Sequence, residues 1–354
     1  MKRFAAVILT VMMMTTLVAG CGSKDTGSEK GTLNVYCFGD YFDPELEERF
    51  EEATGYDVVV DLFDTNEEMY PVIKNNTADY DVICASDYMI EKLLGEDLLA
   101  EINYDNVPNA ENIADNIKPF MEGFDPGMKH SLPHTWGTYG IMYNKTMVDE
   151  EIDSWDVLWD KKYDDEIVMP NSMREGFMLA AKKLGYSINT TDESQIEAMT
   201  DALIEQKPLA YSFDNDRARE IMIGDSAAMA VITSGEVLYS KEYNENLEFV
   251  VPKEGTEVWT DCWAIPATAK NKEAAEAWMN FMLDGEIAEI NFEYLTYAIP
   301  NVKIADLTDD PVLNPSEEIL DRCETLKNLG ILVRRSMPAV ELSIFSPLHW
   351  LISE

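Results

Sequence analysis

Residues 32–88 have the sequence TLNVYCFGDYFDPELEERFEEATGYDVVVDLFDTNEEMYPVIKNNTADYDVICASDY. Three β-type runs, Thr32–Phe38, 58–63 and 80–85, alternate with helical runs at 44–54 and from 66 onward, and Asn66 is expected to cap the second helix. In the first helical run the apolar residues share one face and glycine follows the end, as in an amphipathic surface helix. The third β-type run is nearly all apolar, which is typical of a strand covered on both faces. This alternation predicts a parallel sheet with right-handed helical crossovers.

A second alternation begins near Ile141 and extends the α/β pattern to the rest of the chain. Strand-like runs are expected at 166–169 and 227–232, and helices at 174–184, 192–206, 217–223, 270–283 and 286–294. At about 150 residues per domain, 354 residues suggest two domains.

The amino-acid composition excludes several classes of protein. Hydrophobic residues make up 46% and charged residues 27%, which excludes a disordered, collagenous or polytopic membrane chain. Sixty-seven acidic residues against 27 basic ones give a net charge of −40, so nucleic-acid phosphates and anionic lipids are repelled. The charge favours a cationic ligand, although acidity alone also serves solubility.

The N-terminus predicts export and lipid anchoring. Lys2 and Arg3 precede an apolar run at 4–18 that ends in LVAGC at 17–21, the pattern of a lipoprotein signal peptide. We expect residues 1–20 to be removed, Cys21 to be lipidated and 21–30 to form a flexible tether. The protein is then extracytoplasmic and held to the outer side of the membrane by lipid. An ordinary signal peptide with an incidental cysteine is the alternative.

Aromatic and acidic residues follow the predicted strands, where ligands bind in open α/β sheets. They are Phe38, Asp40, Tyr41, Asp87, Tyr88, Glu175, Trp259, Asp261 and Tyr297. Carboxylates accept charge-assisted hydrogen bonds from ammonium groups, and aromatic rings cover methylenes and attract cations. The pattern therefore suits an organic cation with several amino groups, whereas each residue taken alone fits an ordinary turn or core position.

Metal and thiol chemistry are not expected. His130 and His134 lie near Pro133 and are interpreted as loop residues without a metal or catalytic role. Cys37, Cys84, Cys262 and Cys323 form no zinc-type spacing and are expected as buried thiols, with a disulfide left open.

From about residue 32 to 330 the chain resembles the bacterial spermidine/putrescine-binding lipoproteins that serve ABC importers. The matching stretches are 36–41, 80–88, 131–137, 154–159, 174–175, 183–191, 251–255 (VPKEG), 259–261 (WTD), 264–266 (AIP) and 269–272 (AKNK). The resemblance implies a non-enzymatic, cofactor-free, monomeric protein that captures putrescine or spermidine and delivers it to an inner-membrane permease.

The resemblance also implies roles for individual residues. Glu175 and Asp261 match the ligand acids, Ser86 matches a hydroxyl contact, and Tyr41, Tyr88, Trp259 and Tyr297 match ring positions. Phe38 stands where tryptophan is frequent, Ser172 where an acid is common and Thr233 where another tryptophan is common. Asp87 is an additional acid that we expect to restore charge, and Trp136 is a further candidate contact with Ser172 and Thr233.

The implied fold is the two-lobed, type II periplasmic-binding-protein-like α/β fold, with a mainly parallel sheet in each lobe and the ligand cleft between them. Lobe 1 would comprise 31–136 and 260–305, and lobe 2 141–255 and 309–354, with hinges near 136–140, 256–259 and 305–309. The tail at 331–354 loses the acidic character and does not align with the family pattern.

Other functions remain open at this point. The same fold can take another organic cation or an anion, and a lipoprotein can present its ligand to a receptor instead of a permease. A secreted hydrolase with a Glu175–Asp261 carboxylate dyad is the enzymatic alternative.

Overall fold

The computed structural model describes residues 30–215, 217–307 and 309–327. Nine strands in these residues form one continuous sheet in the order β2-β1-β3-β9-β4-β7-β5-β6, with β8 paired to β4. The strands are β1 (Thr32–Phe38), β2 (Asp57–Phe63), β3 (Val82–Ser86), β4 (Ser131–Asn144), β5 (Ile167–Met169), β6 (Ala210–Phe213), β7 (Met229–Thr233), β8 (Leu247–Val250) and β9 (Val258–Ala264).

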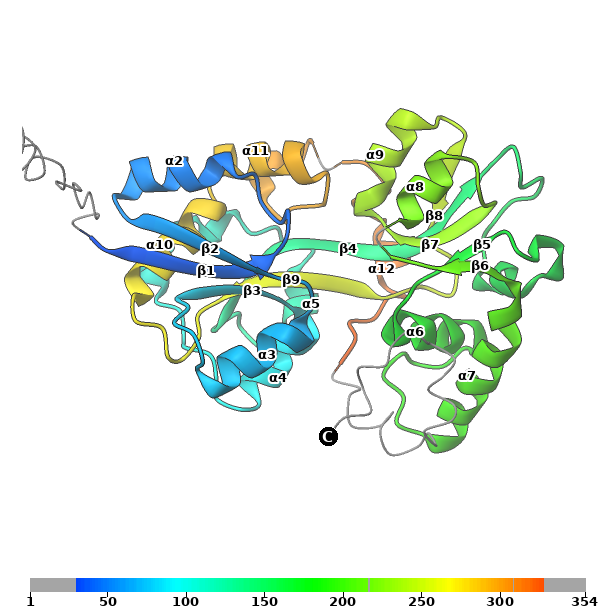
Figure 1. Ribbon diagram of the computed structural model, residues 1–354, viewed down its shortest axis with the longest axis horizontal. Helices are drawn as coiled ribbons and strands as arrows, with labels where there is room; N and C mark the ends of the chain where they lie inside the picture. Colours follow the sequence, from blue (N-terminus) through cyan, green and yellow to red (C-terminus); the bar gives the residue numbers. More distant parts are fainter. Residues whose placement is uncertain (1–29, 216, 308, 328–354) are drawn as a thin grey trace, which may run out of the picture.

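Two long antiparallel strands join the two halves of the molecule. β4 pairs with β9 from Ser131 to Thr138 and then continues to pair with β7 and β8. Figure 1 shows β4 and β9 running from one half into the other. The outer pairs β1–β2, β1–β3, β5–β6 and β5–β7 are parallel, as the βαβ pattern predicts.

Helices cover both faces of the sheet in each half (Figure 1). The half that contains β1 to β3 carries α2 (Glu45–Thr54), α3 (Asn66–Asn75), α4 (Asp87–Leu94), α5 (Lys118–Met121), α10 (Lys272–Met282) and α11 (Gly285–Leu295). The other half carries α6 (Met173–Leu184), α7 (Glu193–Gln206), α8 (Ala218–Ile223) and α9 (Gly235–Tyr243), while α12 (Glu317–Leu320) lies near the centre. Short 3₁₀ turns lie at Tyr104–Asn106, Pro108–Asn112, Trp155–Trp159, Lys161–Tyr163, Lys207–Leu209 and Val302–Ile304.

Each half has its own apolar core. The larger core gathers Leu33, Val35, Phe50 and Trp278 from β1, α2 and α10. The main core of the other half packs Trp155 with residues of β5, α6 and α7. Separate cores on a shared sheet are what a two-lobed α/β fold requires.

Most predicted elements are confirmed, and two local predictions are wrong. Helix α3 is capped by Thr65, whose side chain accepts the Glu68 N–H, and not by Asn66, which is buried and bonds to Ser86. His134 is not in a loop: it lies buried in β4, where its Nε2 contacts the Tyr41 carbonyl oxygen at 2.8 Å. Burial lowers the pKa of this imidazole to about 4, so it is neutral near pH 7.

The four cysteines within the described residues are free thiols, and Cys37, Cys84 and Cys262 are buried. None of the described helices is long and apolar enough to cross a membrane. The predicted signal peptide 1–20, the lipidation site Cys21, most of the tether and the tail 331–354 lie outside the described residues.

Candidate functional site

A cavity of about 210 Å³ lies where the two halves meet. Strand and helix ends from both halves contribute to it: the β3–α4 junction on one side, the first turn of α6 on the other, and β4, β7 and β9 between them. The lining residues are Tyr41, Ser86, Asp87, Tyr88, Tyr139, Arg174, Glu175, Thr233, Glu257, Trp259, Asp261 and Tyr297.

Strand pairing brings the acidic residues of the first half together. Ser86, the last residue of β3, is paired with Asp261 of the antiparallel strand β9. Helix α4 begins at the next residue, so Asp87 and Tyr88 enter the cavity from its first turn. On the opposite side, α6 begins after Ser172 and places Glu175 in its first turn.

Asp261 is buried between hydroxyl groups. One of its carboxylate oxygens, Oδ2, accepts the Tyr41 hydroxyl, which also contacts the Thr135 hydroxyl at 3.2 Å. Its other oxygen, Oδ1, is buried and has no hydrogen-bond partner in the part of the chain that the structure describes. Burial raises the pKa of Asp261, and hydrogen bonds from Ser86 and Tyr41 oppose that shift. A cation at Oδ1 would supply the missing partner and favour the ionised form.

Glu175 presents a similar group from the other half. Its Oε1 accepts the Tyr139 hydroxyl at 3.3 Å, while its Oε2 is buried and has no hydrogen-bond partner within residues 30–215, 217–307 and 309–327. Burial raises the pKa of this carboxyl, and the neighbouring Arg174 guanidinium opposes the rise. Arg174 stacks 3.1 Å from the centre of the Tyr88 ring and contacts Glu67 at 3.3 Å, so it links the two halves.

Asp87 differs from these two acids because its oxygens are already occupied. Oδ1 accepts the Tyr88 backbone N–H at 2.6 Å and Oδ2 accepts that of Thr260 at 3.3 Å. Burial raises the pKa of Asp87 well above its ordinary value, while the two backbone hydrogen bonds lower it. Asp87 therefore offers a ligand no carboxylate oxygen that lacks a hydrogen-bond partner.

Aromatic rings form part of the cavity wall. Trp259 and Tyr297 meet edge to face, with ring centres 5.7 Å apart, and the buried Trp259 Nε1–H has no acceptor among the residues that the structure describes. Gly137 leaves room for this tryptophan, because a Cβ there would lie 2.7 Å from the indole ring. A cation in the cavity thus meets both carboxylates and ring faces.

A neighbouring cavity of about 580 Å³ shares Tyr41, Tyr139, Thr233 and Tyr297 with the first. Asp40 lines this second cavity together with Arg219 and Glu236. Arg219 and Glu236 form an ion pair at 2.7 Å, and the Tyr297 hydroxyl donates to the same glutamate at 2.6 Å.

Most of the predicted site residues line one of the two cavities, and three do not. Phe38 packs behind Tyr41, with ring centres 5.1 Å apart, Trp136 is buried in β4, and Ser172 precedes α6. Tyr139 and Glu257 line the first cavity but were not identified from the sequence. They lie mid-strand in β4 and just before β9, where the strand-end criterion carries no signal.

The chemistry of the site is that of a binding pocket. Its unsatisfied groups are carboxylate oxygens and N–H donors, and no cluster of three metal-ligating side chains occurs in the part of the chain that the structure describes. Two buried carboxylates from opposite halves line the same cavity and can accept the ammonium groups of one small molecule.

The chain is similar to known proteins over most of its length. A family model, bacterial extracellular solute-binding protein, matches residues 45–316. The spermidine/putrescine-binding periplasmic protein 1 of Haemophilus influenzae is 31% identical over 346 residues, which cover 93% of this chain and 95% of that protein. The Escherichia coli K12 spermidine/putrescine-binding periplasmic protein is 32% identical over 302 residues, covering 85% and 86%.

A solved structure shows the same fold at a comparable level of identity. The spermidine/putrescine ABC transporter substrate-binding protein PotD from Streptococcus pneumoniae superposes with a TM-score of 0.76 at 37% identity. The match covers 90% of this chain and 97% of that one.

Proposed function

Because this chain belongs to the bacterial extracellular solute-binding proteins, we propose that it is the substrate-binding component of an ABC importer and that its ligand is a polyamine, putrescine or spermidine. It acts outside the cytoplasm, binds its solute and passes it to a membrane permease. The family consists of solute-binding proteins, so the hydrolase alternative is excluded and the chain is not an enzyme.

One observation carries the choice of ligand: buried, unpartnered carboxylate oxygens of Asp261 and Glu175 line the same cavity. An unpaired buried carboxylate costs free energy, whereas one paired with an ammonium regains much of it. An anionic ligand would face these groups with only Arg174 in its favour among the described residues that line the cavity. A diamine or triamine satisfies both acids at once.

The energetics are sufficient for micromolar binding. A micromolar dissociation constant corresponds to about −8 kcal/mol. Two desolvated ammonium–carboxylate contacts and cation–π attraction of roughly 0.5–2 kcal/mol per ring supply this after the cost of association. The tyrosines and Trp259 cover the methylenes between the amines.

We also propose that closure about hinges creates the surface that the permease recognises. Lobe 1 is assigned to 31–136 and 260–305 and lobe 2 to 141–255 and 309–354, with hinges near 136–140, 256–259 and 305–309. Asp261 belongs to the first lobe and Glu175 to the second, so a ligand held by both favours the closed form over the open one.

The lipid anchor is a further part of the proposal. The sequence LVAGC at 17–21 supports removal of residues 1–20 and lipidation of Cys21. Expression of the Cys21→Ala variant should release the protein into the medium or the soluble fraction, whereas the wild type stays with the membrane. Equal membrane retention of both forms would refute the anchor. The monomeric state is checked by light scattering.

Calorimetric titration with putrescine, spermidine and spermine at two salt concentrations tests the function. We expect Asp261→Asn and Glu175→Gln each to lose about 2–4 kcal/mol of binding free energy, because a buried ammonium loses its counter-charge. Asp201→Asn, on the exposed face of α7, is the matched control and should bind like the wild type.

Two results would contradict the proposal. If none of the three amines binds while a sugar or an uncharged amino acid does, the ligand class is wrong. If Asp261→Asn binds amines as tightly as the control, the carboxylates do not provide the recognition.

A further inference from the structure

We propose that Glu257 is a ligand-binding residue, and that Glu257 and Glu175 together bind one primary ammonium group at the end of the ligand. The inference depends on the proposed function, because it describes how one end of a polyamine is held. It adds a third carboxylate with an unpartnered oxygen to the Asp261 and Glu175 pair, and it specifies the chemical form of the amine at that end.

Glu257 lies inside the first cavity and is almost fully buried, with 5% of its surface exposed. Its Oε2 has no hydrogen-bond partner among the described residues. A buried carboxylate oxygen without a hydrogen-bond partner is costly for the folded protein. Stabilisation of the fold therefore does not explain why a glutamate occupies this position.

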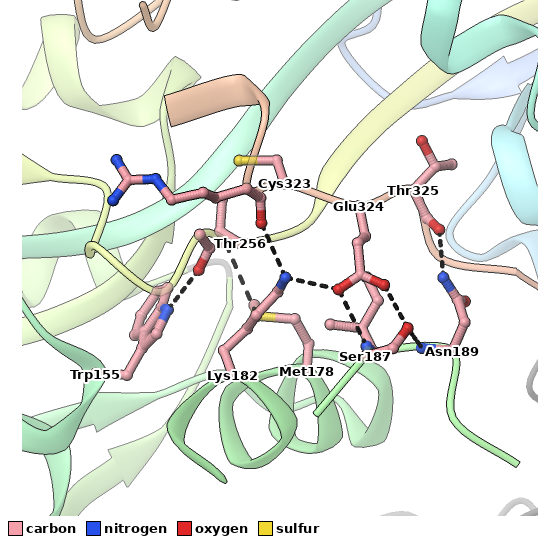
Figure 2. A network of polar contacts seen from close by, with 12 residues as sticks. Trp155, Met178, Lys182, Ser187, Asn189, Thr256, Cys323, Glu324 and Thr325 are labelled. Atoms are coloured by element: carbon pink, nitrogen blue, oxygen red, sulfur yellow. Dashed lines mark hydrogen bonds and ion pairs between the residues drawn. The ribbon is translucent and has the colours of Figure 1, made fainter. Parts of the chain in front are cut away.

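The backbone on both sides of Glu257 is held firmly. Val258 N–H donates to the Glu324 carbonyl and Glu324 N–H donates to the Thr256 carbonyl, both at 3.0 Å. Figure 2 shows Thr256 and the Glu324 segment side by side, with Glu324 also bound by Lys182 and Ser187. The segment that carries Glu257 is thus fixed from outside, so its carboxylate is preorganised in the cavity.

Glu257 and Glu175 line the same cavity. After burial, Glu175 is the largest cause of the raised pKa of Glu257, ahead of Asp87 and Asp261, while Arg174 opposes the shift. Burial also raises the pKa of the Tyr139 hydroxyl, and Glu175 and Glu257 are the next causes. Glu175, Glu257 and the Tyr139 hydroxyl that donates to Glu175 therefore line one cavity, while Asp261 accepts the Tyr41 hydroxyl.

The number of acceptors in this group matches the number of N–H donors of a primary ammonium. A primary ammonium has three N–H donors on one carbon substituent. The Oε2 atoms of Glu175 and Glu257 are two unpartnered acceptors, and the Tyr139 oxygen, which donates to Glu175, keeps lone pairs to accept a third bond. A secondary ammonium has two N–H groups and a carbon chain on each side, so it leaves one acceptor unpaired. We therefore assign this end to a terminal amine.

The test is calorimetric titration of the purified protein and its Glu257→Gln variant with putrescine and with N,N,N′,N′-tetramethylputrescine. The methylated diamine keeps both charges but has one N–H at each end. We expect Glu257→Gln to bind putrescine 10- to 100-fold more weakly. The preference for putrescine over its methylated form should also shrink by at least fivefold, because one acceptor for the primary amine has lost its charge.

Controls separate this inference from the proposed function. Glu245→Gln changes the same charge on an exposed loop residue and should bind within twofold of the wild type. If the wild type binds neither amine, the proposed function itself fails. If the wild type binds putrescine and Glu257→Gln binds it within threefold, only the role of Glu257 is refuted.

A second variant tests the proposal if Glu257→Gln does not fold. Should Glu257→Gln fail to give a cooperative thermal transition, Glu257→Asp retains the charge and withdraws the carboxylate by one methylene. It should then weaken putrescine binding about tenfold, and wild-type affinity in this variant would overturn the proposal.

Discussion

The ion pair between Lys182 and Glu324 offers the sharpest stability prediction. Lys182 of α6 is almost fully buried, and its ammonium donates to Glu324 Oε1 at 2.7 Å and to the Arg322 carbonyl at 3.0 Å. Ser187 donates a further hydrogen bond to the same carboxylate (Figure 2). Through these contacts the segment after α12 is attached to the second half of the molecule.

Glu324→Gln should destabilise the protein by about 2–3 kcal/mol at pH 7. Removing one partner of a buried ion pair costs about 3–5 kcal/mol. The lower value applies here because the Glu324 side chain is 30% exposed and a glutamine oxygen can still accept a bond from Lys182. At roughly 2 °C per kcal/mol for a chain of this size, the melting temperature should fall by about 4–6 °C.

The pH dependence of this effect has a definite sign. Lys182 and Ser187 hold the pKa of Glu324 below its ordinary value despite burial. A carboxyl with a lowered folded-state pKa stabilises the fold above its unfolded pKa of about 4.3, and that stabilisation is lost as pH falls through the folded value. The difference in the free energy of unfolding between wild type and Glu324→Gln should therefore have its full value at pH 7 and be close to zero at pH 2–3.

Thermal melts followed by tryptophan fluorescence provide the measurement. Glu317→Gln, an exposed change on α12, is the matched control and should melt within 1 °C of the wild type. In a Lys182→Met background the Glu324→Gln change should cost less than 1 kcal/mol, because the buried cation is gone. An equal loss in both backgrounds would show that the ion pair is not the cause.

Two further predictions concern the backbone and the cavity. Gly255→Ala should lower the free energy of unfolding by at least about 2 kcal/mol, because φ is +79° and a Cβ would overlap the Arg322 carbonyl oxygen. Gly185 also has a positive φ, +72°, but the space around it is open, so Gly185→Ala should lower the free energy of unfolding by only about 1 kcal/mol in the same melts. Glu175→Gln should raise the melting temperature of the ligand-free protein at pH 8 and change it little at pH 4. In the wild type, the folded-state pKa of the Glu175 carboxyl is raised, so the protein loses stability as pH rises from about 4 through that pKa. A melting temperature of Glu175→Gln below that of the wild type at pH 8 would contradict this reasoning.

The sequence predicts the sheet well because strand signals are local. Runs such as Val82–Ser86 are buried on both faces, and their apolar composition records that burial directly. The sequence predicts the first residue of a helix less well where two possible N-cap residues are adjacent. Thr65 and Asn66 are both suitable caps, and the choice is made by a residue 20 positions away, since Asn66 bonds to Ser86.

Pro133 explains why the His134 segment was misassigned. Proline has no N–H and normally argues against a central strand. Here it lies in β4 at the point where the pairing with β9 changes register, between Pro133 and Thr135. The missing donor is therefore tolerated by the irregularity, and such an irregularity depends on the partner strand rather than on the local sequence.

The strand-end rule identified Asp261, Glu175 and Tyr88 because sheet topology brings such ends to one edge, but it gave no indication of Glu257. That residue enters the cavity because its segment is paired with Glu324, 67 positions later in the chain. Two buried acids that repel one another lower the stability of the free protein. A ligand cation removes that repulsion, so binding should stabilise the fold by more than its contacts with Asp261 alone would supply. In the function that we propose, the acids that destabilise the free protein are the source of its selectivity for amines.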